Sequence, residues 1–268
     1  MNGLHKTIVG AQASSVKPYL QTPEDLRASL QKLAEMGYRL VQMQWWNPEF
    51  SPEFVAEAVR DAGLQCVSTQ DFYETVKGDF ARTVRLNELC GSRCVCVSGI
   101  PAKEANPSGA LGREAVLAFA EELAEMAARL APHGMTLAFH PRAREWAVLA
   151  DAGGVTATEL LLQNSPENVT LGLDLYHSGK AGLAADALLR RFAGRTEFVH
   201  FKDFVVDAAG TEHLTPVGHG QTDWRAAVAA CRETGVPWAF AEQEKWEKDA
   251  FDCMRESLAA MRAWGFEA

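Results

Sequence analysis

The feature that most constrains the fold is a regular alternation between short apolar runs and longer amphipathic stretches. Eight runs rich in β-branched and other apolar residues, typical of buried strands, occur at 6–12, 38–46, 65–72, 94–100, 136–140, 169–174, 196–203 and 238–243. A stretch of helical period follows each run, with no low-complexity linker between them. Repeated strand and helix units of this kind are typical of a parallel sheet covered by helices.

Capping residues support the helical assignments. Thr22 and Ser51 each stand before a proline at the start of an amphipathic stretch, and those stretches end at Gly37 and Gly63. These signals predict helices between residues 22 and 37 and between residues 51 and 63. Further helical patterns cover 76–91, 111–134, 157–164, 183–194, 222–235 and 250–265.

Eight such units in 268 residues predict an α/β protein with a single (β/α)₈ TIM barrel, which we expect to form one domain over residues 1–268. The alternative is a doubly wound open sheet. That fold usually carries a glycine-rich phosphate loop after its first strand, and the segment GAQASSVKP at 10–18 has no such loop. The closed barrel is therefore favoured.

Composition excludes several functional classes. The net charge of −9 and the scattered Lys and Arg residues argue against nucleic acid as a partner. No apolar run approaches the roughly 18 to 20 residues that span a bilayer, and residues 1–10 lack the pattern of a signal peptide, so we expect a cytoplasmic protein without a membrane partner. The six cysteines lie mostly in apolar segments, which predicts reduced thiols. A homo-oligomer remains possible.

Four polar residues close or interrupt the last four apolar runs. They are His140, Asp174, His200 and Glu242. A parallel barrel builds its active site at the carboxyl ends of its strands, so these side chains should converge. A buried carboxylate needs a compensating partner, and imidazole with carboxylate suits a divalent metal ion. A lone histidine is more often an ordinary core residue, but the combination favours a metal site.

Four segments carry a resemblance to a known family. GLDLYHSG at 172–179, FVHFKDF at 198–204, PVGHGQTDW at 216–224 and AFAEQEKW at 239–246 resemble the sugar phosphate isomerase/epimerase family, also called the xylose isomerase-like TIM barrel family. The Asp-x-x-His and His-x-Lys-Asp motifs are its most specific parts. The resemblance implies a divalent ion, with Mn²⁺ favoured ahead of Mg²⁺, Co²⁺ or Zn²⁺, held by Asp174, His200 and Glu242.

The fifth strand departs from the family pattern. His140 stands where many members have a glutamate, in the segment HPRAREW at 140–146, and Glu145 matches a later acidic position of one branch. Members commonly use glutamates on strands five and eight as a pair that removes and returns a proton next to a carbonyl. An imidazole at 140 could bind the ion or act as the base. Which of the two it does stays open, and the two-glutamate mechanism is in question.

Other residues are candidates for the same site. Glu242, His140, Glu145 and Lys202 are the candidate catalytic residues, although for Lys202 a salt bridge with a nearby carboxylate is slightly favoured over a contact with substrate. By the resemblance, His177 would contact a substrate hydroxyl. Gln42 and Gln44 share the parity of inward-facing strand residues, so their amides could bind a polyol or be satisfied internally. Arg142 and Trp146 could line the barrel mouth.

These residues predict a metal-dependent enzyme acting on a small-molecule substrate, either a sugar, a keto-sugar or a cyclitol. Isomerisation or epimerisation by proton transfer next to a carbonyl comes first. Dehydration is the alternative, because the same intermediate can expel a hydroxyl. Phosphoester hydrolysis and a non-catalytic carbohydrate-binding barrel are less favoured.

Overall fold

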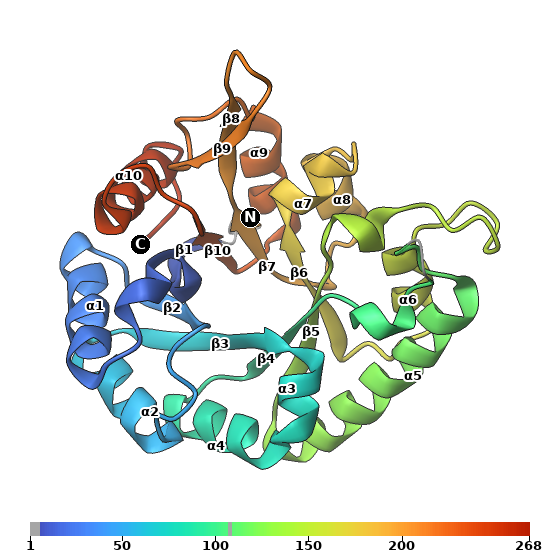
Figure 1. Ribbon diagram of the computed structural model, residues 1–268, viewed down its shortest axis with the longest axis horizontal. Coiled ribbons are helices and arrows are strands. Elements are labelled where there is room, and N and C mark those ends of the chain that lie inside the picture. Colours follow the sequence, from blue (N-terminus) through green and yellow to red (C-terminus); the bar gives the residue numbers. More distant parts are fainter. Residues whose placement is uncertain (1–5, 107–108) are drawn as a thin grey trace, which may run out of the picture.

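The structure is a computed structural model that describes residues 6–106 and 109–268. In this part of the chain, eight parallel strands close into a barrel in the order β1, β2, β3, β4, β5, β6, β7, β10, with β10 paired to β1 (Figure 1). The strands are β1 Ile8–Gln12, β2 Leu40–Met43, β3 Gln65–Phe72, β4 Cys94–Ser98, β5 Thr136–His140, β6 Val169–Asp174, β7 Thr196–Phe201 and β10 Trp238–Ala241. The predicted barrel is confirmed.

The helices form a ring around the strands, and α10 returns beside α1 to close it (Figure 1). They are α1 Pro23–Met36, α2 Pro52–Asp61, α3 Tyr73–Gly78, α4 Phe80–Cys90, α5 Arg113–Leu130, α6 Ala157–Gln163, α7 Leu175–Lys180, α8 Ala185–Arg191, α9 Arg225–Thr234 and α10 Ala250–Ala263. Within the described ranges, no helix is long and apolar enough to cross a membrane. The residues preceding Lys6, where we expected no leader, lie outside the described residues.

The predicted caps form as expected. The Thr22 hydroxyl accepts a hydrogen bond from the backbone of Asp25 at 3.1 Å, and α1 ends at Gly37 with a φ of 105°. The Ser51 hydroxyl accepts from the backbone of Phe54 at 3.1 Å at the start of α2. These contacts satisfy amide groups that a helix leaves unpaired at its first turn.

Two aromatic rings fill the barrel interior below the candidate site. Phe198 and Phe240 are fully buried, and their ring centroids lie 5.5 Å apart. Each ring occupies space that a glycine leaves on the adjacent strand. A Cβ on Gly172 would lie 2.3 Å from the Phe198 ring, and a Cβ on Gly10 would lie 2.5 Å from the Phe240 ring. The glycines therefore set the packing that supports the strand ends above.

One helix that was predicted to be continuous is two separate helices in the structure. The pattern at 76–91 forms the end of α3 and all of α4, separated at Asp79. The Asp79 carboxylate accepts a hydrogen bond from the backbone of Arg82 at 3.2 Å, so this residue starts a new helix. The strand predicted at 38–46 is also shorter, because regular pairing ends at Met43.

A hairpin interrupts the seventh unit, between β7 and α9, and was not predicted. Strands β8 Asp203–Val206 and β9 Glu212–Thr215 pair antiparallel and project from the barrel end (Figure 1). The Asp207 carboxylate accepts from the backbones of Ala209 at 2.9 Å and Thr211 at 2.8 Å, which holds the turn. The hairpin places Glu212 close to α7, where it pairs with Lys180 at 2.6 Å.

The cysteines behave as predicted. All six thiols are free, and five of them are buried while Cys90 is partly exposed. Cys94 and Cys96 face the barrel interior with the apolar side chains around them. Burial raises the pKa of the Cys96 thiol, which keeps it protonated and unreactive.

Candidate metal centre

Four predicted side chains meet at the carboxyl end of the barrel. Residues His140 and Asp174 end β5 and β6, His200 is the penultimate residue of β7, and Glu242 directly follows β10. One ligand atom from each lies within 4.8 Å of the other three. All four side chains are buried, and Asp174 pairs with His200 in the strand register. The convergence predicted from the strand ends is confirmed.

The separations between these atoms match those of ligands that share one ion. His140 Nε2 lies 3.1 Å from His200 Nδ1, and His200 Nδ1 lies 2.9 Å from Glu242 Oε2. His140 Nε2 lies 3.7 Å from Asp174 Oδ2. Nitrogen ligands about 2.0–2.1 Å from a tetrahedral zinc ion stand about 3.4 Å apart, so the donor set has suitable dimensions.

Gln42 determines which nitrogen of His200 faces the cluster. The Gln42 Oε1 atom lies 2.6 Å from His200 Nε2 and can only accept, so Nε2 carries the hydrogen. Gln12 Nε2 donates to the same oxygen at 2.6 Å, and Gln42 Nε2 donates to Ser68 Oγ at 3.0 Å. In a neutral ring, the Nδ1 lone pair then points at the Glu242 carboxylate. That contact is repulsive unless a proton on Nδ1 or a metal ion stands between them.

Each acidic residue uses one oxygen for support and leaves the other without a hydrogen-bond partner. Asp174 Oδ1 accepts from the backbones of Tyr176 at 2.8 Å and His177 at 2.9 Å, and thereby caps α7. Glu242 Oε1 accepts from Ser14 Oγ at 3.3 Å. Asp174 Oδ2 and Glu242 Oε2 are buried and accept no hydrogen bond from any residue that the structure describes. Unsatisfied buried carboxylate oxygens of this kind fit a metal ion.

Lys202 compensates part of the acidic charge. Its Nζ lies 3.3 Å from Asp174 Oδ2 and 3.4 Å from Glu242 Oε2, and it donates a hydrogen bond to Glu244 Oε2 at 2.9 Å. Three carboxylates around one ammonium leave a surplus of negative charge. A divalent cation would offset this surplus, while Glu244 gives Lys202 an anchor that does not involve the candidate ligands.

The ionisation of these groups follows from their neighbours. Burial raises the pKa of the Asp174 carboxyl, but the charges of Lys202 and His177 outweigh burial and hold this pKa well below its usual range. Burial also raises the pKa of the Glu242 carboxyl, but the charges of Lys202 and His200 outweigh burial and lower this pKa. For Lys202, burial lowers the pKa, and the carboxylates of Asp174 and Glu242 more than reverse that effect. Both acids are therefore ionised at neutral pH.

The sequence profile of the xylose isomerase-like TIM barrel family matches residues 30–264. This chain belongs to that family. The match covers most of the barrel, including all four residues of the candidate metal centre. A comparison with curated proteins finds no match.

Solved structures of similar fold include the following three. A sugar phosphate isomerase/epimerase from Parabacteroides distasonis is 17% identical with a TM-score of 0.78, covering 100% of this chain and 97% of that one. A probable 3-DHS dehydratase, AsbF from Bacillus anthracis, is 14% identical with a TM-score of 0.69, covering 96% and 98%. The IolI protein with a bound zinc atom is 14% identical with a TM-score of 0.70, covering 96% and 98%. At these identities the similarity establishes the fold alone.

In this xylose isomerase-like barrel, some predicted substrate-binding residues border the centre. His177 Nε2 lies 3.8 Å from Asp174 Oδ2, and burial lowers the pKa of this imidazole. Gln44 is 6% exposed, and its Oε1 has no hydrogen-bond partner in the described part of the chain. Gln42 instead contacts the Nε2 side of the His200 ring, away from the cluster. This position favours a role in orienting the His200 imidazole over a contact with substrate. The substrate-binding roles of all three remain predictions.

The loop after β5 places the remaining predicted residues differently. Glu145 is buried, with Oε1 accepting from the backbone of Ile100 at 3.1 Å and Oε2 from the backbone of Arg142 at 2.9 Å. These bonds give Glu145 a clear structural use in shaping the loop. Trp146 is 2% exposed and packs on Phe192, within the core between barrel and helices. Arg142 is exposed at the mouth. A catalytic role for Glu145 and a substrate contact for Trp146 stay predictions.

Several residues around the centre were not among the predictions. They are Gln12, Ser14, Ser98 and Glu244. Gln12 and Ser98 end apolar strands, which is the same signal that identified His140. Ser98 Oγ lies 3.4 Å from His140 Nδ1. Ser14 lies in a short 3-10 helix after β1 and Glu244 in a loop, where no periodic pattern indicates which way a side chain points.

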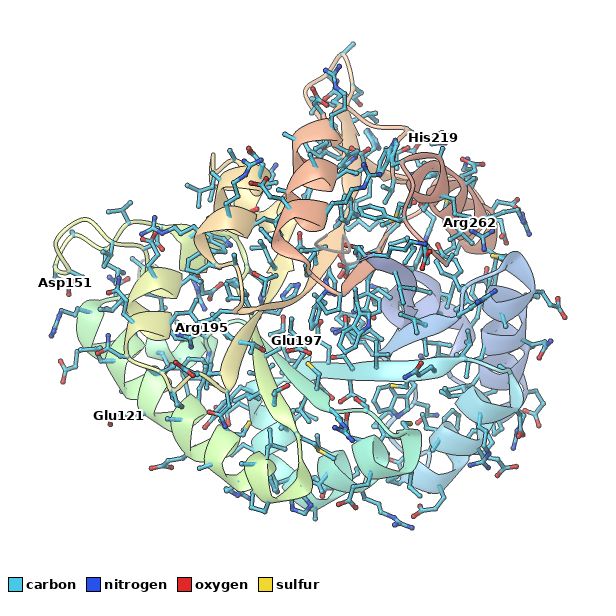
Figure 2. The ribbon with its side chains drawn as sticks, turned by 180° about the vertical axis from the view of Figure 1, so that it is seen from behind. Glu121, Asp151, Arg195, Glu197, His219 and Arg262 are labelled. Atoms are coloured by element: carbon cyan, nitrogen blue, oxygen red, sulfur yellow. The ribbon has the colours of Figure 1, made fainter. Side chains whose placement is uncertain are left out.

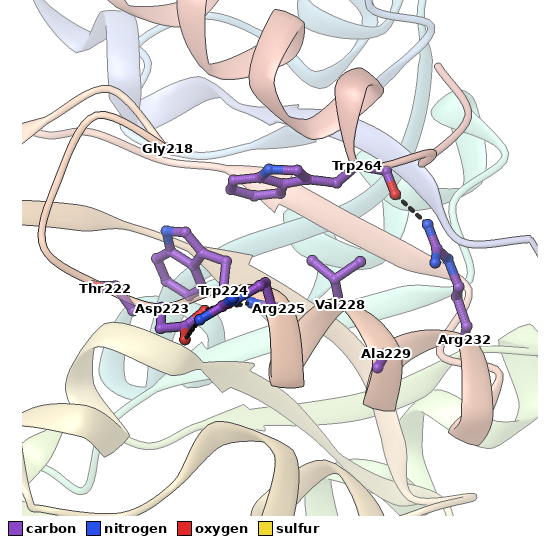
Figure 3. Close-up of a pocket in the computed structure, with 9 residues that line it drawn as sticks. All are labelled: Gly218, Thr222, Asp223, Trp224, Arg225, Val228, Ala229, Arg232 and Trp264. Atoms are coloured by element: carbon purple, nitrogen blue, oxygen red, sulfur yellow. Dashed lines mark hydrogen bonds and ion pairs between the residues drawn. The ribbon is translucent and has the colours of Figure 1, made fainter.

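A cavity of about 400 Å³ lies away from this centre, beside α9 on the outside of the barrel (Figure 3). Two tryptophans, Trp224 and Trp264, flank it. The two arginines at its edge are already engaged, because Arg225 pairs with Asp223 at 2.7 Å and Arg232 donates to the carbonyl of Trp264. It contains none of the candidate catalytic groups. We therefore place the candidate active site at the four converging side chains and not at this cavity.

The opposite end of the barrel also carries an acidic residue. Glu197 stands near the amino end of β7 and lies close to the centre of the ring when the molecule is seen from behind (Figure 2). Burial raises the pKa of its carboxyl. The cluster lies at the other end of the same strand, at His200. Active sites of TIM barrels lie at the carboxyl end, which favours the cluster.

Proposed function

We propose that the protein is a divalent-metal-dependent isomerase or epimerase acting on a sugar, keto-sugar or cyclitol. One observation carries the proposal. His140, Asp174, His200 and Glu242 present ligand atoms within 4.8 Å of one another, and two of their buried carboxylate oxygens accept no hydrogen bond. A dehydratase is the alternative, and a binding protein without chemistry would have little use for such a costly cluster.

Asp174, His200 and Glu242 would hold the ion, and His140 would either be a fourth ligand or act as the base. Nitrogen and oxygen donors without thiolate suit Mn²⁺, Mg²⁺, Co²⁺ or Zn²⁺, and we favour Mn²⁺. The zinc in the similar IolI structure supports a divalent ion on this fold. When bound, the ion would polarise a substrate carbonyl or hydroxyl pair.

The chain's own residues supply proton transfer from two directions. Glu242 and His140 belong to strand ends separated by β6 and β7, so they flank the space above Asp174 and His200. Side chains on two sides of a bound substrate suit removal of a proton at one face of a carbon and its return at the other. Lys202 lies between the carboxylates, where its ammonium would stabilise negative charge on a substrate oxygen. Acid–base assistance of this kind contributes about 10² to 10⁴ in rate.

Dehydration shares the first step with epimerisation. Removal of a proton next to the carbonyl can be followed by loss of a β-hydroxyl in place of reprotonation. His140 supports this alternative, because an imidazole can return its proton to a leaving hydroxyl group. The similarity to a probable dehydratase is in agreement with it. A product 18 Da lighter than the substrate would identify dehydration.

The test is hydrogen exchange. We would incubate the protein with Mn²⁺ and a panel of keto-sugars and ketocyclitols in D₂O and follow deuterium at the carbon next to the carbonyl by NMR. Exchange with at least one compound is expected, and it should disappear with EDTA and in Asp174→Asn. Asp186→Asn, at a partly exposed residue of α8 that pairs with Arg190, is the matched control. Absence of exchange across the panel with protein that holds its ion would contradict the proposal.

A further inference from the structure

Two exposed aromatic side chains stand together at the mouth of the barrel. Trp45 follows β2 and Phe72 ends β3, and they are 44% and 45% exposed with ring centroids 6.4 Å apart. Trp45 has a φ of 64° and is the one non-glycine residue with positive φ among those the structure describes. Gln21 Nε2 donates to the Trp45 carbonyl at 3.0 Å and holds this backbone conformation. Strained residues of this kind concentrate at ligand sites.

The strand register connects these rings to the metal centre. Phe72 pairs with Ser98 on β4, and Ser98 pairs with His140 on β5. Phe72 therefore lies in the same layer of the barrel as His140, two strands away. Adjacent strands are separated by about 4.8 Å, so the backbones of these two residues are roughly 10 Å apart. A ligand of two linked rings can span this distance.

Two buried amides lie below the aromatic rings. Gln44 and Gln70 are 6% and 3% exposed, and the Oε1 atom of each lacks a hydrogen-bond partner among residues 6–106 and 109–268. The register between β2 and β3 ends with Met43 opposite Thr69, so the two glutamines occupy the next position on adjacent strands. Buried acceptors are normally satisfied. Hydroxyl groups of a polyol would satisfy this pair.

Two cations flank the rings. Lys17 Nζ lies 4.4 Å from the centroid of the Trp45 ring, and the guanidinium carbon of Arg142 lies 5.7 Å from that of Phe72. Arg142 also reaches the carbonyl of Ser98 at 3.5 Å. Within residues 6–106 and 109–268, neither cation forms a salt bridge with a carboxylate. Unneutralised cations beside exposed rings favour an anionic ligand.

We propose that these residues form a second subsite, the mouth subsite, made of Trp45, Phe72, Gln44, Gln70 and the two cations. It binds the far part of the substrate, a flat unsaturated ring that carries a carboxylate or phosphate and is joined to the polyol. The glutamines bind polyol hydroxyls, the aromatic side chains pack against the ring, and the cations pair with the anion. This inference rests on the proposed function, in which the polyol reacts at the metal centre.

The test compares the affinities of three probes by isothermal titration calorimetry on Mn²⁺-supplemented protein. The probes are methyl, phenyl and 4-carboxyphenyl glucoside. Affinity should rise in that order, with 4-carboxyphenyl glucoside binding at least about tenfold more tightly than methyl glucoside. Equal affinities, including no measurable binding of any probe, would overturn the subsite. A 4-phosphonooxyphenyl probe distinguishes the two anions.

Substitutions at the mouth subsite test whether its residues cause the preference for aryl glucosides over methyl glucoside. Trp45→Gly, which suits the positive φ, and Phe72→Ala should each reduce the aryl preference at least about threefold, and Arg142→Gln should remove the added effect of the carboxylate. Tyr19→Ala removes a ring that is 40% exposed and packs on Phe251, and should leave the preference unchanged. An unchanged preference in all three mouth variants would refute the assignment.

Failure of the subsite and failure of the proposed reaction are distinguishable. Hydrogen exchange with unsubstituted keto-sugars tests only the metal centre, whereas the binding series tests only the mouth. Exchange without aryl preference would refute the subsite and keep the reaction. Aryl preference without exchange would keep the subsite and refute the reaction.

Discussion

His200 donates its Nε2 hydrogen to Gln42 Oε1 over 2.6 Å across the barrel interior. This contact orients the imidazole and directs Nδ1 toward His140 and Glu242, at 3.1 and 2.9 Å. Partners of this kind behind a metal ligand fix its tautomer and raise its basicity. A glutamine on β2 therefore orients a candidate metal ligand on β7.

Replacement of Gln42 should weaken metal binding. Gln42→Leu removes the acceptor, and we expect a loss of about 10- to 100-fold in Mn²⁺ affinity by titration calorimetry. Gln42→Glu keeps an acceptor oxygen and should lose less. The ¹⁵N chemical shifts of His200 provide a second readout, because they distinguish a ring protonated at Nε2 from one protonated at Nδ1. Unchanged affinity and unchanged shifts in Gln42→Leu would rule out this role.

Lys202 should stabilise the metal-free protein. Lys202→Met leaves Asp174 and Glu242 buried without their cation, and loss of one partner of a buried pair costs about 3–5 kcal/mol. We expect a clear fall in the melting temperature in EDTA and a smaller fall with Mn²⁺, since the ion replaces part of the lost charge. An equal fall under both conditions would show that Lys202 and the ion do not share these carboxylates.

The stability of the metal-free protein should decline at acidic pH. The pKa of Asp174 is lower in the folded protein than in the unfolded chain, where it is about 3.9. Below that pH, the unfolded chain binds a proton that folded Asp174 does not, so folding loses free energy as pH falls toward the folded-state pKa. Urea unfolding in EDTA from pH 6 to pH 2.5 measures this slope. Asp174→Asn should have a shallower slope, and an identical one would contradict the pKa shift.

Gly172 should be intolerant of a side chain. A Cβ there would lie 2.3 Å from the Phe198 ring, which stacks below His200 with centroids 5.1 Å apart. Gly172→Ala should cost about 1–3 kcal/mol of stability and weaken metal binding by displacing the imidazole. Gly179→Ala is the control, because a Cβ added there would have no neighbouring atom within 4 Å. Equal melting temperatures for the two variants would contradict the packing argument.

The sequence predicted the barrel and its centre because both depend on periodic patterns. His140 and Asp174 end strands whose bounds were predicted without error, at 136–140 and 169–174. The hairpin at 203–215 was missed because its strands are only partly buried and lack a clear alternation. Contacts such as Lys202 with Glu244 depend on loop conformation, as does the positive φ of Trp45. Neither leaves a local signal in the sequence.

The metal content of the purified protein tests the central claim most directly. Elemental analysis after supplementation with Mn²⁺ and removal of free ion should find about one divalent ion per chain, and Asp174→Ala should lose it while remaining folded by circular dichroism. Asp186→Ala, which removes a partly exposed carboxylate on α8 that pairs with Arg190, should retain it. A folded Asp174→Ala protein that still holds a stoichiometric ion, or a wild-type protein that binds none, would contradict the account.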